Sequence, residues 1–388
     1  MRTVANKSRV LYFYPYLQFD TGSPKAMVQF IDLLDRRVFT PVYCAPGTGP
    51  LTEALVSRGV EIVPYREDEV SFRRPAAAVA AIYRQAKLLK QWNIDLIHAN
   101  CFPWNTDLLL AAGIVGIPVI VHVHNPLDVA SRNLVRFAAR KVLFCSGAVM
   151  QNARNLHRIP AKSEVLYNVI DVEAWSRGHS IRSSLGLSEG DIAVGTVAQI
   201  VHRKGIDILL ETARTLLRER KDLVFVIAGP PMESEKEFGQ RMTAIAQEPA
   251  FGGRVRFLGS RADIPDLMAS LDLFVLPTRA EPLGIVILEA MAAGVPVIAS
   301  KVGGIPEMLS SPEIGTLVDP LTPEAFAQAI REVLSRPDRG ISMGDRGRAS
   351  LTGRFDSVTG GRQLEGIYLK ALGRPALRDH AASLVSPG

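Results

Sequence analysis

The chain has 388 residues, of which 47% are apolar, and its formal net charge at pH 7 is +6. A single hydrophobic core stops growing at roughly 250–300 residues, so this length predicts two domains rather than one. The composition is that of a globular protein, and no segment is polar enough to predict extensive disorder.

The apolar runs are too short to span a membrane. The longest extend over about 8 to 14 residues, whereas a membrane-spanning helix needs roughly 20. The N-terminal segment lacks the cleavage pattern of a signal peptide and leads directly into a predicted strand. The widely spaced Cys44, Cys101 and Cys145 fit neither a disulfide framework nor a metal cluster, and buried free thiols are expected. Together these features favour a soluble cytoplasmic protein.

Positive charge is concentrated in the first half of the chain. Residues 1–170 carry 20 Lys and Arg against 12 Asp and Glu, whereas residues 171–388 carry 25 against 27. A basic half suits an anionic neighbour, which would be a phospholipid surface, a phosphorylated acceptor or nucleic acid. Arginine-rich solvated helix faces explain the same excess equally well.

Strand-like runs alternate with helical patterns from the first segment to the last. In the first half, strands are predicted at 9–15, 41–46, 61–65, 95–100, 118–124, 141–146 and 164–168, and helices at 25–37, 51–59, 76–92 and 105–116. In the second half, strands are predicted at 192–199, 223–229, 255–259, 273–277, 296–300 and 315–319. Helices are predicted there at 205–220, after residue 237, and at 264–270, 284–294, 305–309 and 323–335.

This alternation, with continuously apolar strands, indicates parallel sheets that are covered on both faces. Because it occurs twice, the fold class is α/β, with two doubly wound Rossmann-like domains. Residues 168–191 between the two halves lack periodicity, so we place the domains at 1–174 and 175–372, followed by a frayed tail at 373–388. Ligands of such sheets bind at the carboxyl ends of strands, so two facing domains predict a cleft between them.

The segment 281–300, EPLGIVILEAMAAGVPVIAS, places two glutamates in an otherwise apolar run. A strand is predicted to end at Pro277 and a helix to extend to Gly294, which puts Glu281 in the loop before the helix and Glu289 in its second turn. The isolated run 285–288 resembles a strand, but the length and context favour a buried helix. The amides of residues 283–285 then form a helix N-terminus, which favours phosphate.

Spacing and charge together suggest a ligand. Eight helical residues separate the two carboxylates by about 12 Å at most. That span suits a diphosphate with a polyol on each side, which is the shape of a nucleotide sugar. Two glutamates at this spacing are common by chance, so the interpretation depends on their apolar surroundings, where an unpaired carboxylate is costly.

Several segments, in the same order, resemble the retaining family-4 glycosyltransferases, which have the GT-B fold. The string EPLGIVILEAMAAGVPVIASKVGGIPEML is similar to the specific signature of that family. Weaker likenesses are DLIHAN at 95–100, PVIVHVHN at 118–125, KVLFCSGAV at 141–149, LYNVIDVEAW at 166–175, LDLFVLPT at 271–278 and GTLVDPLTPEAFAQAI at 315–330. The likeness covers almost the whole chain.

The resemblance implies roles for residues that match the motifs. Glu281 would bind hydroxyls of the donor sugar near the reacting carbon, and Glu289 would hold the ribose hydroxyls. Leu283, Gly284 and Ile285 would offer backbone N–H groups to the donor.

Outside the signature, Lys204 matches a phosphate-binding lysine and His124 a histidine that contacts the donor sugar. Gly22 falls where the family has a Gly-rich loop facing the phosphates, and Arg261 lies in a loop that meets the nucleobase. For single residues the plain alternatives are a surface helix start for Lys204 and a core histidine for His124. His98 is interpreted as structural.

Two positions depart from the family pattern. Gln199 stands where an arginine is usual, which leaves Arg203 as the candidate second cation for the diphosphate. Thr21-Gly22-Ser23-Pro24 replaces the usual Gly-Gly pair, and proline removes a donor N–H. These changes bear on donor binding and not on the fold.

The expected activity is transfer of a sugar from a nucleotide-diphosphate sugar to a glycan, lipid-linked or small-molecule acceptor, with a role in polysaccharide biosynthesis. No metal motif or cofactor is predicted, because cationic side chains and a helix N-terminus would stabilise the leaving diphosphate. The family retains the anomeric configuration, and without a clear nucleophile we expect same-face substitution. Alternatives are an inactive GT-B scaffold, a nucleotide-sugar 2-epimerase and, with no recognisable module, a nucleic-acid binder.

Two sets of cations are candidates for contact with anionic lipid at the inner face of a membrane or with a lipid-diphosphate acceptor. Arg84, Lys87 and Lys90 recur at three-residue spacing on one predicted helix, and residues 132, 136 and 140 are arginines at four-residue spacing. Solvated helix faces explain both patterns as well.

Overall fold

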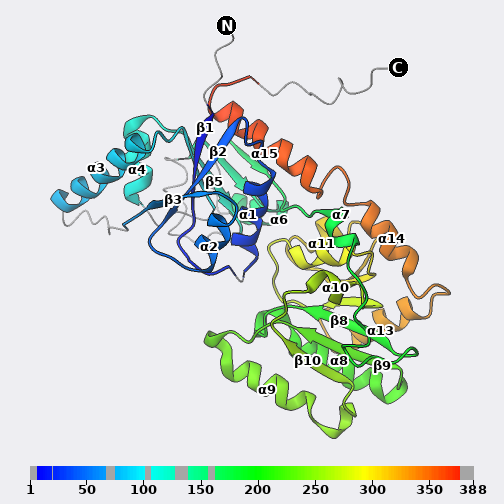
Figure 1. The fold of residues 1–388 in the computed structure, drawn as a ribbon. Helices are drawn as coiled ribbons and strands as arrows, with labels where there is room; N and C mark the ends of the chain where they lie inside the picture. The colour runs from blue at the N-terminus through cyan, green and yellow to red at the C-terminus, as the bar shows by residue number, and fades with distance from the viewer. Residues whose placement is uncertain are drawn as a thin grey trace, which may run out of the picture. The chain divides into compact units, whose positions relative to one another are not determined.

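The computed structural model describes residues 7–19, 21–66, 75–100, 106–126, 139–155 and 162–375 (Figure 1). The chain divides into two compact units. The N-terminal unit comprises Met1–Leu166 and Val358–Gly388, and the C-terminal unit comprises Tyr167–Ser357. Each is a parallel sheet with interleaved helices, so the predicted α/β class with two doubly wound sheets is confirmed.

The N-terminal unit contains a parallel sheet in the order β3-β2-β1-β4-β5-β6-β7. Its strands are β1 (Ser8–Phe13), β2 (Phe39–Ala45), β3 (Glu61–Pro64), β4 (Leu96–Ala99), β5 (Val119–Val123), β6 (Lys141–Phe144) and β7 (Ser163–Val165). The helices described are α1 (Gly22–Leu33), α2 (Pro50–Val56), α3 (Pro75–Gln91), α4 (Thr106–Val115), α6 (Gly147–Asn155) and α15 (Ser357–Ala371). Successive residues of a strand face opposite sides, and 10–12 of β1 are all fully buried, so both faces are covered.

Helix α15 belongs to the N-terminal unit although it comes last in the chain. The Tyr368 hydroxyl of α15 lies 2.7 Å from the Tyr12 hydroxyl of β1 and 2.7 Å from Nδ1 of His98 in β4. Gly361 allows α15 to approach α1, because a Cβ there would lie 3.2 Å from Cβ of Leu33. The units therefore divide between Leu166 and Tyr167 and again at Val358, whereas the sequence places the boundary at 174/175 and this helix in the second domain.

The C-terminal unit contains a parallel sheet in the order β10-β9-β8-β11-β12-β13. Its strands are β8 (Ile192–Val197), β9 (Leu223–Ala228), β10 (Val255–Gly259), β11 (Leu273–Leu276), β12 (Val297–Ser300) and β13 (Thr316–Val318). The α-helices are α7 (Val172–Ser176), α8 (Ile206–Glu219), α9 (Lys236–Ala246), α10 (Ile264–Met268), α11 (Ile285–Ala292), α12 (Ile305–Met308), α13 (Pro323–Leu334) and α14 (Ile341–Ala349). Short 3₁₀ turns are η1 (His202–Lys204), η2 (Glu233–Glu235) and η3 (Pro249–Phe251).

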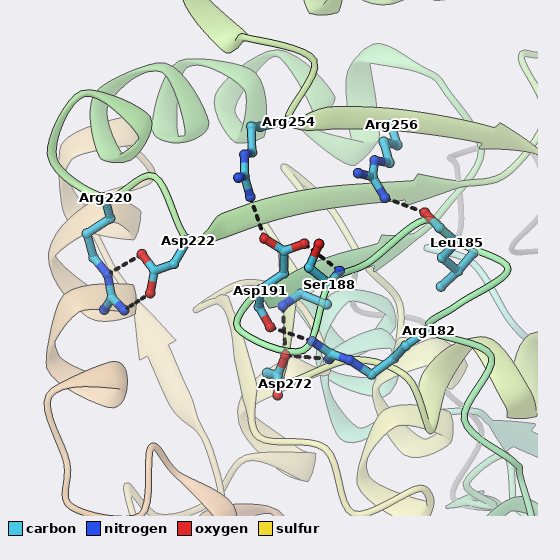
Figure 2. A network of polar contacts seen from close by, with 10 residues as sticks. Arg182, Leu185, Ser188, Asp191, Arg220, Asp222, Arg254, Arg256 and Asp272 are labelled. Carbon is cyan, nitrogen blue, oxygen red and sulfur yellow. Dashed lines mark hydrogen bonds and ion pairs between the residues drawn. The ribbon is translucent and has the colours of Figure 1, made fainter.

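Charged residues tie the amino ends of these strands together (Figure 2). Asp272, just before β11, accepts hydrogen bonds from the Ala193 amide at 2.7 Å and from Arg182 at 2.8 Å. Asp191, just before β8, accepts from the Ser188 amide at 2.7 Å and from Arg254 at 2.5 Å. This network lies at the edge opposite the carboxyl ends of the strands, so Asp272 has a structural role.

Every predicted strand overlaps an observed one, whereas α6, α7, α14 and α15 were not predicted. Cys44 and Cys145 are buried free thiols, as expected. Cys101, residues 132 and 136 of the arginine series, and residues 376–388 of the predicted tail lie outside the described residues. No helix among the described residues has both the length and the apolar composition needed to cross a bilayer.

Candidate functional site

The topology of the C-terminal sheet singles out one place for a ligand. Strands β8 and β11 are neighbours, but the chain leaves β8 towards β9 on one side and leaves β11 towards β12 on the other. Ligands of doubly wound sheets bind at such a switch point, outside the carboxyl ends of the strands. The loops that follow β8 and β11 carry Lys204 and Glu281, respectively.

Lys204 and Glu281 form a largely enclosed ion pair. The Lys204 Nζ lies 2.5 Å from Oε2 of Glu281, and the two side chains are only 13% and 10% exposed. An Arg203 guanidinium nitrogen lies 3.8 Å from the same oxygen. Adjacent residues usually point apart, yet Arg203 and Lys204 both reach Glu281. The other carboxylate oxygen, Oε1, has no hydrogen bond to the described part of the chain and remains an acceptor for a ligand.

Hydrogen bonds and an ion pair fasten the two loops to each other. The Arg203 carbonyl accepts hydrogen bonds from the Thr278 hydroxyl at 3.0 Å and from the Arg279 amide at 2.8 Å. Arg279 also forms a bidentate pair with Asp207 in the first turn of α8, at 2.7 and 2.8 Å. The Arg203 guanidinium in turn donates to the Ala280 carbonyl at 2.9 Å. The guanidinium of Arg279 is thus engaged by Asp207, whereas Arg203 and Lys204 reach Glu281.

Asp207→Asn is expected to destabilise the protein at neutral pH, by about 1.5–3 kcal/mol, because a charged bidentate bond is lost. Burial alone would raise the pKa of Asp207, but its bonds to Arg279 lower the pKa below the ordinary 3.8. A lowered pKa stabilises the fold above the ordinary value, and that contribution disappears as pH falls below it. The difference between wild type and Asp207→Asn should therefore be full at pH 7 and shrink below about pH 4, as measured by urea unfolding.

Asp263→Asn is the matched control, since the ion pair of Asp263 in the described part of the chain is with Arg261, two positions away. The two pairs are similarly exposed, but Arg261 and Asp263 are two positions apart and join no separate segments, so their pair should contribute less than about 1 kcal/mol. If Asp207→Asn is no less stable than Asp263→Asn at pH 7, the two loops are not held together by Asp207.

Glycines allow the backbones of the site to meet. Gly205 has φ +71°, and a Cβ there would lie 1.8 Å from the Pro277 carbonyl oxygen. Gly303 has φ +53°, and a Cβ there would lie 1.9 Å from the Glu281 carbonyl oxygen. That same oxygen accepts a hydrogen bond from the Gly304 amide at 3.1 Å. The Gly303-Gly304 pair therefore supports the backbone of Glu281.

Helix α11 (Figure 1) begins at Ile285, so Glu281 lies in the loop before it, as predicted. Its N-cap is Gly284, with φ +103°, and no side chain caps the helix. The amides of Leu283, Gly284 and Ile285 have no hydrogen bond to any described residue. Unpaired amides at a helix N-terminus carry partial positive charge and favour an anion. The site therefore combines a bare helix N-terminus, two cations and a carboxylate.

Two other predicted site residues of this unit, Glu289 and Arg261, lie outside the Lys204–Glu281 pair. Glu289 lies in the second turn of α11, as predicted, and is partly exposed while the four residues 288 and 290–292 around it are buried. Arg261 follows β10, and its guanidinium is paired with Asp263 at 2.5 Å. It is at the same sheet edge as Lys204, with β9 and β8 between β10 and β11. No contact joins Arg261 to the Lys204–Glu281 pair among the described residues.

Gln199 lies two residues after the end of β8. Its side-chain amide nitrogen is buried and has no hydrogen-bond partner in the described part of the chain. Gln199 thus supplies a donor without a charge, and Arg203 supplies the second positive charge next to Lys204.

Gly22 and His124 lie in the N-terminal unit, where the switch point is between β1 and β4 and β5 lies next to β4. Gly22 is the first residue of α1, and His124 follows β5. Asn100, which follows β4, links the two: its side chain lies 3.0 Å from His124 Nε2 and 3.0 Å from the carbonyl of Ser23 in α1. The structure thus brings Arg203, Lys204 and Glu281 together in the C-terminal unit and places His124 near the start of α1 in the N-terminal unit, whereas Arg261 lies apart.

His124 is a neutral group in the folded protein. Burial lowers its pKa well below the ordinary value, and the nearby His122 and His98 lower it further. Burial also lowers the pKa of His122, to about 4. The imidazole of His124 therefore cannot serve as a cation near neutral pH.

The sequence analysis did not identify four residues that shape these groups: Asn100, Asp207, Thr278 and Arg279. The rule that ligand sites follow strand ends points to Asn100 and Thr278, since each lies just past a buried strand. Nothing in the sequence pairs Asp207 with Arg279, which are 72 positions apart.

Comparison with known families gives two matches that together span most of the chain. Residues 179–350 match the model described as "Glycosyl transferases group 1". Residues 22–174 match the model described as "Glycosyltransferase Family 4". The first match covers both loops of the candidate site in the C-terminal unit, and the second covers Gly22 and His124.

Similar curated proteins include two from bacteria. The chain is 26% identical to the N-acetyl-alpha-D-glucosaminyl L-malate synthase of Bacillus anthracis, over 78% of this chain and 81% of that protein. It is 27% identical to the alpha-D-kanosaminyltransferase of Streptomyces kanamyceticus, over 74% of this chain and 80% of that protein.

Solved structures with the same fold include a glycosyltransferase of Rickettsia africae, with a TM-score of 0.85, 18% identity, and coverage of 95% of this chain and 100% of that chain. HepE of Anabaena, crystallised with UDP-glucose, has a TM-score of 0.80 and 22% identity, covering 93% of this chain and 99% of that chain. These likenesses establish the two-domain GT-B fold.

Proposed function

Since the chain belongs to the group 1 glycosyltransferases, we propose that it moves a sugar from a nucleotide-diphosphate sugar to a glycan, lipid-linked or small-molecule acceptor, retaining the anomeric configuration without a metal ion. The observation that carries this proposal is the Lys204–Glu281 pair beside the bare amide end of α11. Similarity to transferases favours neither the epimerase nor the inactive scaffold.

The diphosphate is proposed to lie at the N-terminus of α11. The amides of residues 283–285 would donate to its oxygens, and Lys204 and Arg203 would neutralise charge as it builds up on the leaving group. Fixed donors and cations of this kind stabilise a developing anion without reorganisation, which is the work a divalent ion does elsewhere. Glu289, in the second turn of α11, would accept hydrogen bonds from the ribose diol.

The sugar is proposed to lie against Glu281. Oε2 of that carboxylate already holds both cations, so Oε1 would accept a sugar hydroxyl. In the step itself, the bond from the anomeric carbon to the phosphate oxygen breaks and the bond to the acceptor oxygen forms on the same face. The acceptor proton passes to the leaving phosphate oxygen, so no protein nucleophile is needed.

The test is transfer by the purified protein from UDP-, GDP- and ADP-sugars, with and without a chelator. One donor should raise the melting temperature, because a ligand at 100 times its Kd adds about 2.7 kcal/mol of stability. That donor should release nucleoside diphosphate at a rate unaffected by the chelator, and NMR should show the donor's anomeric configuration in the product.

Each other outcome contradicts a specific part of the proposed function. Donor binding without nucleotide release indicates a scaffold, and epimerised free sugar indicates an epimerase. Inversion in the product contradicts retention, and loss of activity with the chelator contradicts metal independence. If none of the nucleotide sugars is bound or turned over, the proposed function is wrong.

We further propose that the enzyme contacts an anionic membrane through α3 and α4, which pack side by side (Figure 1). Lys87 and Lys90 lie on the exposed face of α3, in line with Val79 and Tyr83, which are 66% and 71% exposed. Ile114 of α4 is 72% exposed. Exposed apolar side chains beside lysines match a bilayer surface, where cations meet headgroups and apolar groups enter the interface.

Vesicle flotation at low salt tests this contact. Wild type should float with phosphatidylglycerol vesicles and not with phosphatidylcholine vesicles. Reversing two cations in Lys87→Glu/Lys90→Glu should weaken partitioning at least tenfold, because each cation contributes about 1 kcal/mol. Lys236→Glu/Lys370→Glu changes the net charge equally at exposed positions elsewhere, and it should float like wild type. Equal loss in both double variants, or no flotation of wild type, contradicts the proposed surface.

A further inference from the structure

Asn100 is enclosed between the N-terminus of α1 and His124. It has no exposed surface, and its backbone amide donates to the Phe13 carbonyl of β1 at 2.9 Å. Its side-chain nitrogen lies 3.0 Å from the Ser23 carbonyl oxygen and 3.1 Å from the Ser23 hydroxyl. Its side-chain oxygen lies 3.0 Å from Nε2 of His124. Every polar atom of Asn100 is therefore next to a defined neighbour.

The Ser23 carbonyl fixes the orientation of this amide. A carbonyl oxygen only accepts hydrogen bonds, so the Asn100 atom facing it must be the nitrogen. Rotating the amide by 180° would bring two acceptor oxygens to 3.0 Å. The Ser23 hydroxyl is consistent with this orientation, since it lies within reach to donate to the Asn100 carbonyl at 3.4 Å and accept from the side-chain nitrogen.

The orientation of Asn100 determines where the proton of His124 lies. The Asn100 oxygen can only accept, so His124 must donate to it from Nε2–H. A neutral imidazole carries one proton, and burial keeps His124 neutral by lowering its pKa. Nδ1 is therefore a bare acceptor. It is buried and has no hydrogen-bond partner among the residues that the structure describes, and the whole residue is 7% exposed.

The ring packed on His124 does not supply that partner. His122 lies with its centroid 4.2 Å from that of His124, and its Nε2 lies 3.3 Å from the Leu166 carbonyl. Because that carbonyl accepts, His122 carries its proton on Nε2, and its own Nδ1 also has no partner within the described ranges. His98, on the other side of His122, is engaged by the Tyr368 hydroxyl. His122 and His98 thus offer no hydrogen-bond donor to Nδ1 of His124.

We propose that Asn100 is a positioning residue that holds His124 in the Nε2-protonated form, so that Nδ1 accepts a hydrogen bond from a hydroxyl of a bound sugar. This inference rests on the proposed function for its ligand, whereas the tautomer itself follows from the structure. It means that His124 accepts from the ligand and neither donates a proton nor carries charge in the reaction. A ligand hydroxyl would satisfy an acceptor that is otherwise left orphaned in the interior.

The tautomer of His124 can be determined by NMR without measuring enzyme activity. In protein with ¹⁵N-labelled histidines, the chemical shifts of the two ring nitrogens show which one is protonated. The signals of His124 are identified by their loss in His124→Gln, among the 7 histidines of the chain. We expect a protonated Nε2 and an unprotonated Nδ1 whose shift changes when a nucleotide sugar is added. A protonated Nδ1 in wild type overturns the proposal. If a nucleotide sugar binds and the chemical shift of Nδ1 does not change, the proposed hydrogen bond to the sugar is wrong.

Two variants of nearly equal shape separate positioning from packing. Asn100→Asp replaces the donor to Ser23 with an oxygen but keeps an acceptor facing His124, so the Nε2–H form should persist. Asn100→Leu removes the acceptor, so Nδ1–H should appear and KM for the donor should rise roughly tenfold with a smaller change in kcat. If Asn100→Leu keeps the Nε2–H form, or if Asn100→Asp and Asn100→Leu raise KM equally, Asn100 is only a packing residue. Should Asn100→Leu fail to fold, the wild-type and Asn100→Asp spectra still decide the tautomer.

Discussion

Glu281→Gln should lower turnover at least tenfold at saturating donor. Glutamine keeps the shape of the side chain and an oxygen that can accept from a sugar hydroxyl. It removes the negative charge that holds Lys204 at 2.5 Å and Arg203 at 3.8 Å. Hydrogen bonds to charged groups contribute about 1.5–3 kcal/mol, which corresponds to a factor of ten or more in rate.

The same substitution should also reduce stability, by about 1–3 kcal/mol, because Lys204 remains largely enclosed without its counter-charge. Steady-state transfer and urea unfolding measure the two effects separately. Glu237→Gln is the control, since Glu237 is an exposed glutamate on α9 of the same unit and should change neither quantity. Wild-type turnover in folded Glu281→Gln would show that this carboxylate takes no part in the reaction.

Gly303→Ala should reduce turnover by roughly a hundredfold. The new Cβ would lie 1.9 Å from the Glu281 carbonyl oxygen, and this contact forces the Glu281 backbone to move by more than an ångström. Misplacement of a catalytic group by about 1 Å costs on the order of 10² in rate. The hydrogen bond from the Gly304 amide to the same oxygen should be lost as well.

Gly252→Ala separates this contact from backbone strain. Gly252 has φ +54°, almost the same as the +53° of Gly303, but a Cβ there would meet nothing within 4 Å. Both alanines should carry about 1–2 kcal/mol of left-handed strain. Only Gly303→Ala should lose transfer, as measured by product formation at matched amounts of folded protein. Equal activity of the two variants would mean that the approach of Gly303 to Glu281 does not position the carboxylate.

The sheets were predictable from the sequence because parallel strands buried on both faces leave unbroken apolar runs between helical patterns. The same logic resolved the ambiguous run 285–288, which lies in α11 and not in a strand. The following Gly294, at φ +76°, ends the helix as the sequence suggested. The positions of Lys204 and Glu281 after neighbouring strands followed from the rule for switch points together with the family motifs.

Features that depend on long-range contacts were not predictable. Helices α14 and α15 contain glycines such as Gly344, Gly347 and Gly361, which weaken the helical signal in the sequence. Those glycines are explained by close neighbours, as Gly361 is by Leu33. The membership of α15 in the N-terminal unit depends on Tyr368, whose partners lie on strands far away in the chain.

The polar supports of the site were missed for a related reason. Asp207 and Arg279 each resemble an ordinary surface charge in the sequence, and only the meeting of two loops shows that they form a pair. Asn100 lies in a motif that was recognised, but its role depends on the Ser23 carbonyl, which no sequence pattern reveals. Residues that match a family motif were therefore easier to identify than the residues that orient them through long-range contacts.

The most direct test is a crystal structure of the protein with the nucleotide sugar that it turns over. We expect diphosphate oxygens at hydrogen-bond distance, about 2.7–3.2 Å, from the amides of residues 283–285 and from Lys204 Nζ, with a sugar hydroxyl on Glu281. A diphosphate bound away from the N-terminus of α11, or a sugar that leaves Glu281 without a contact, would contradict the account.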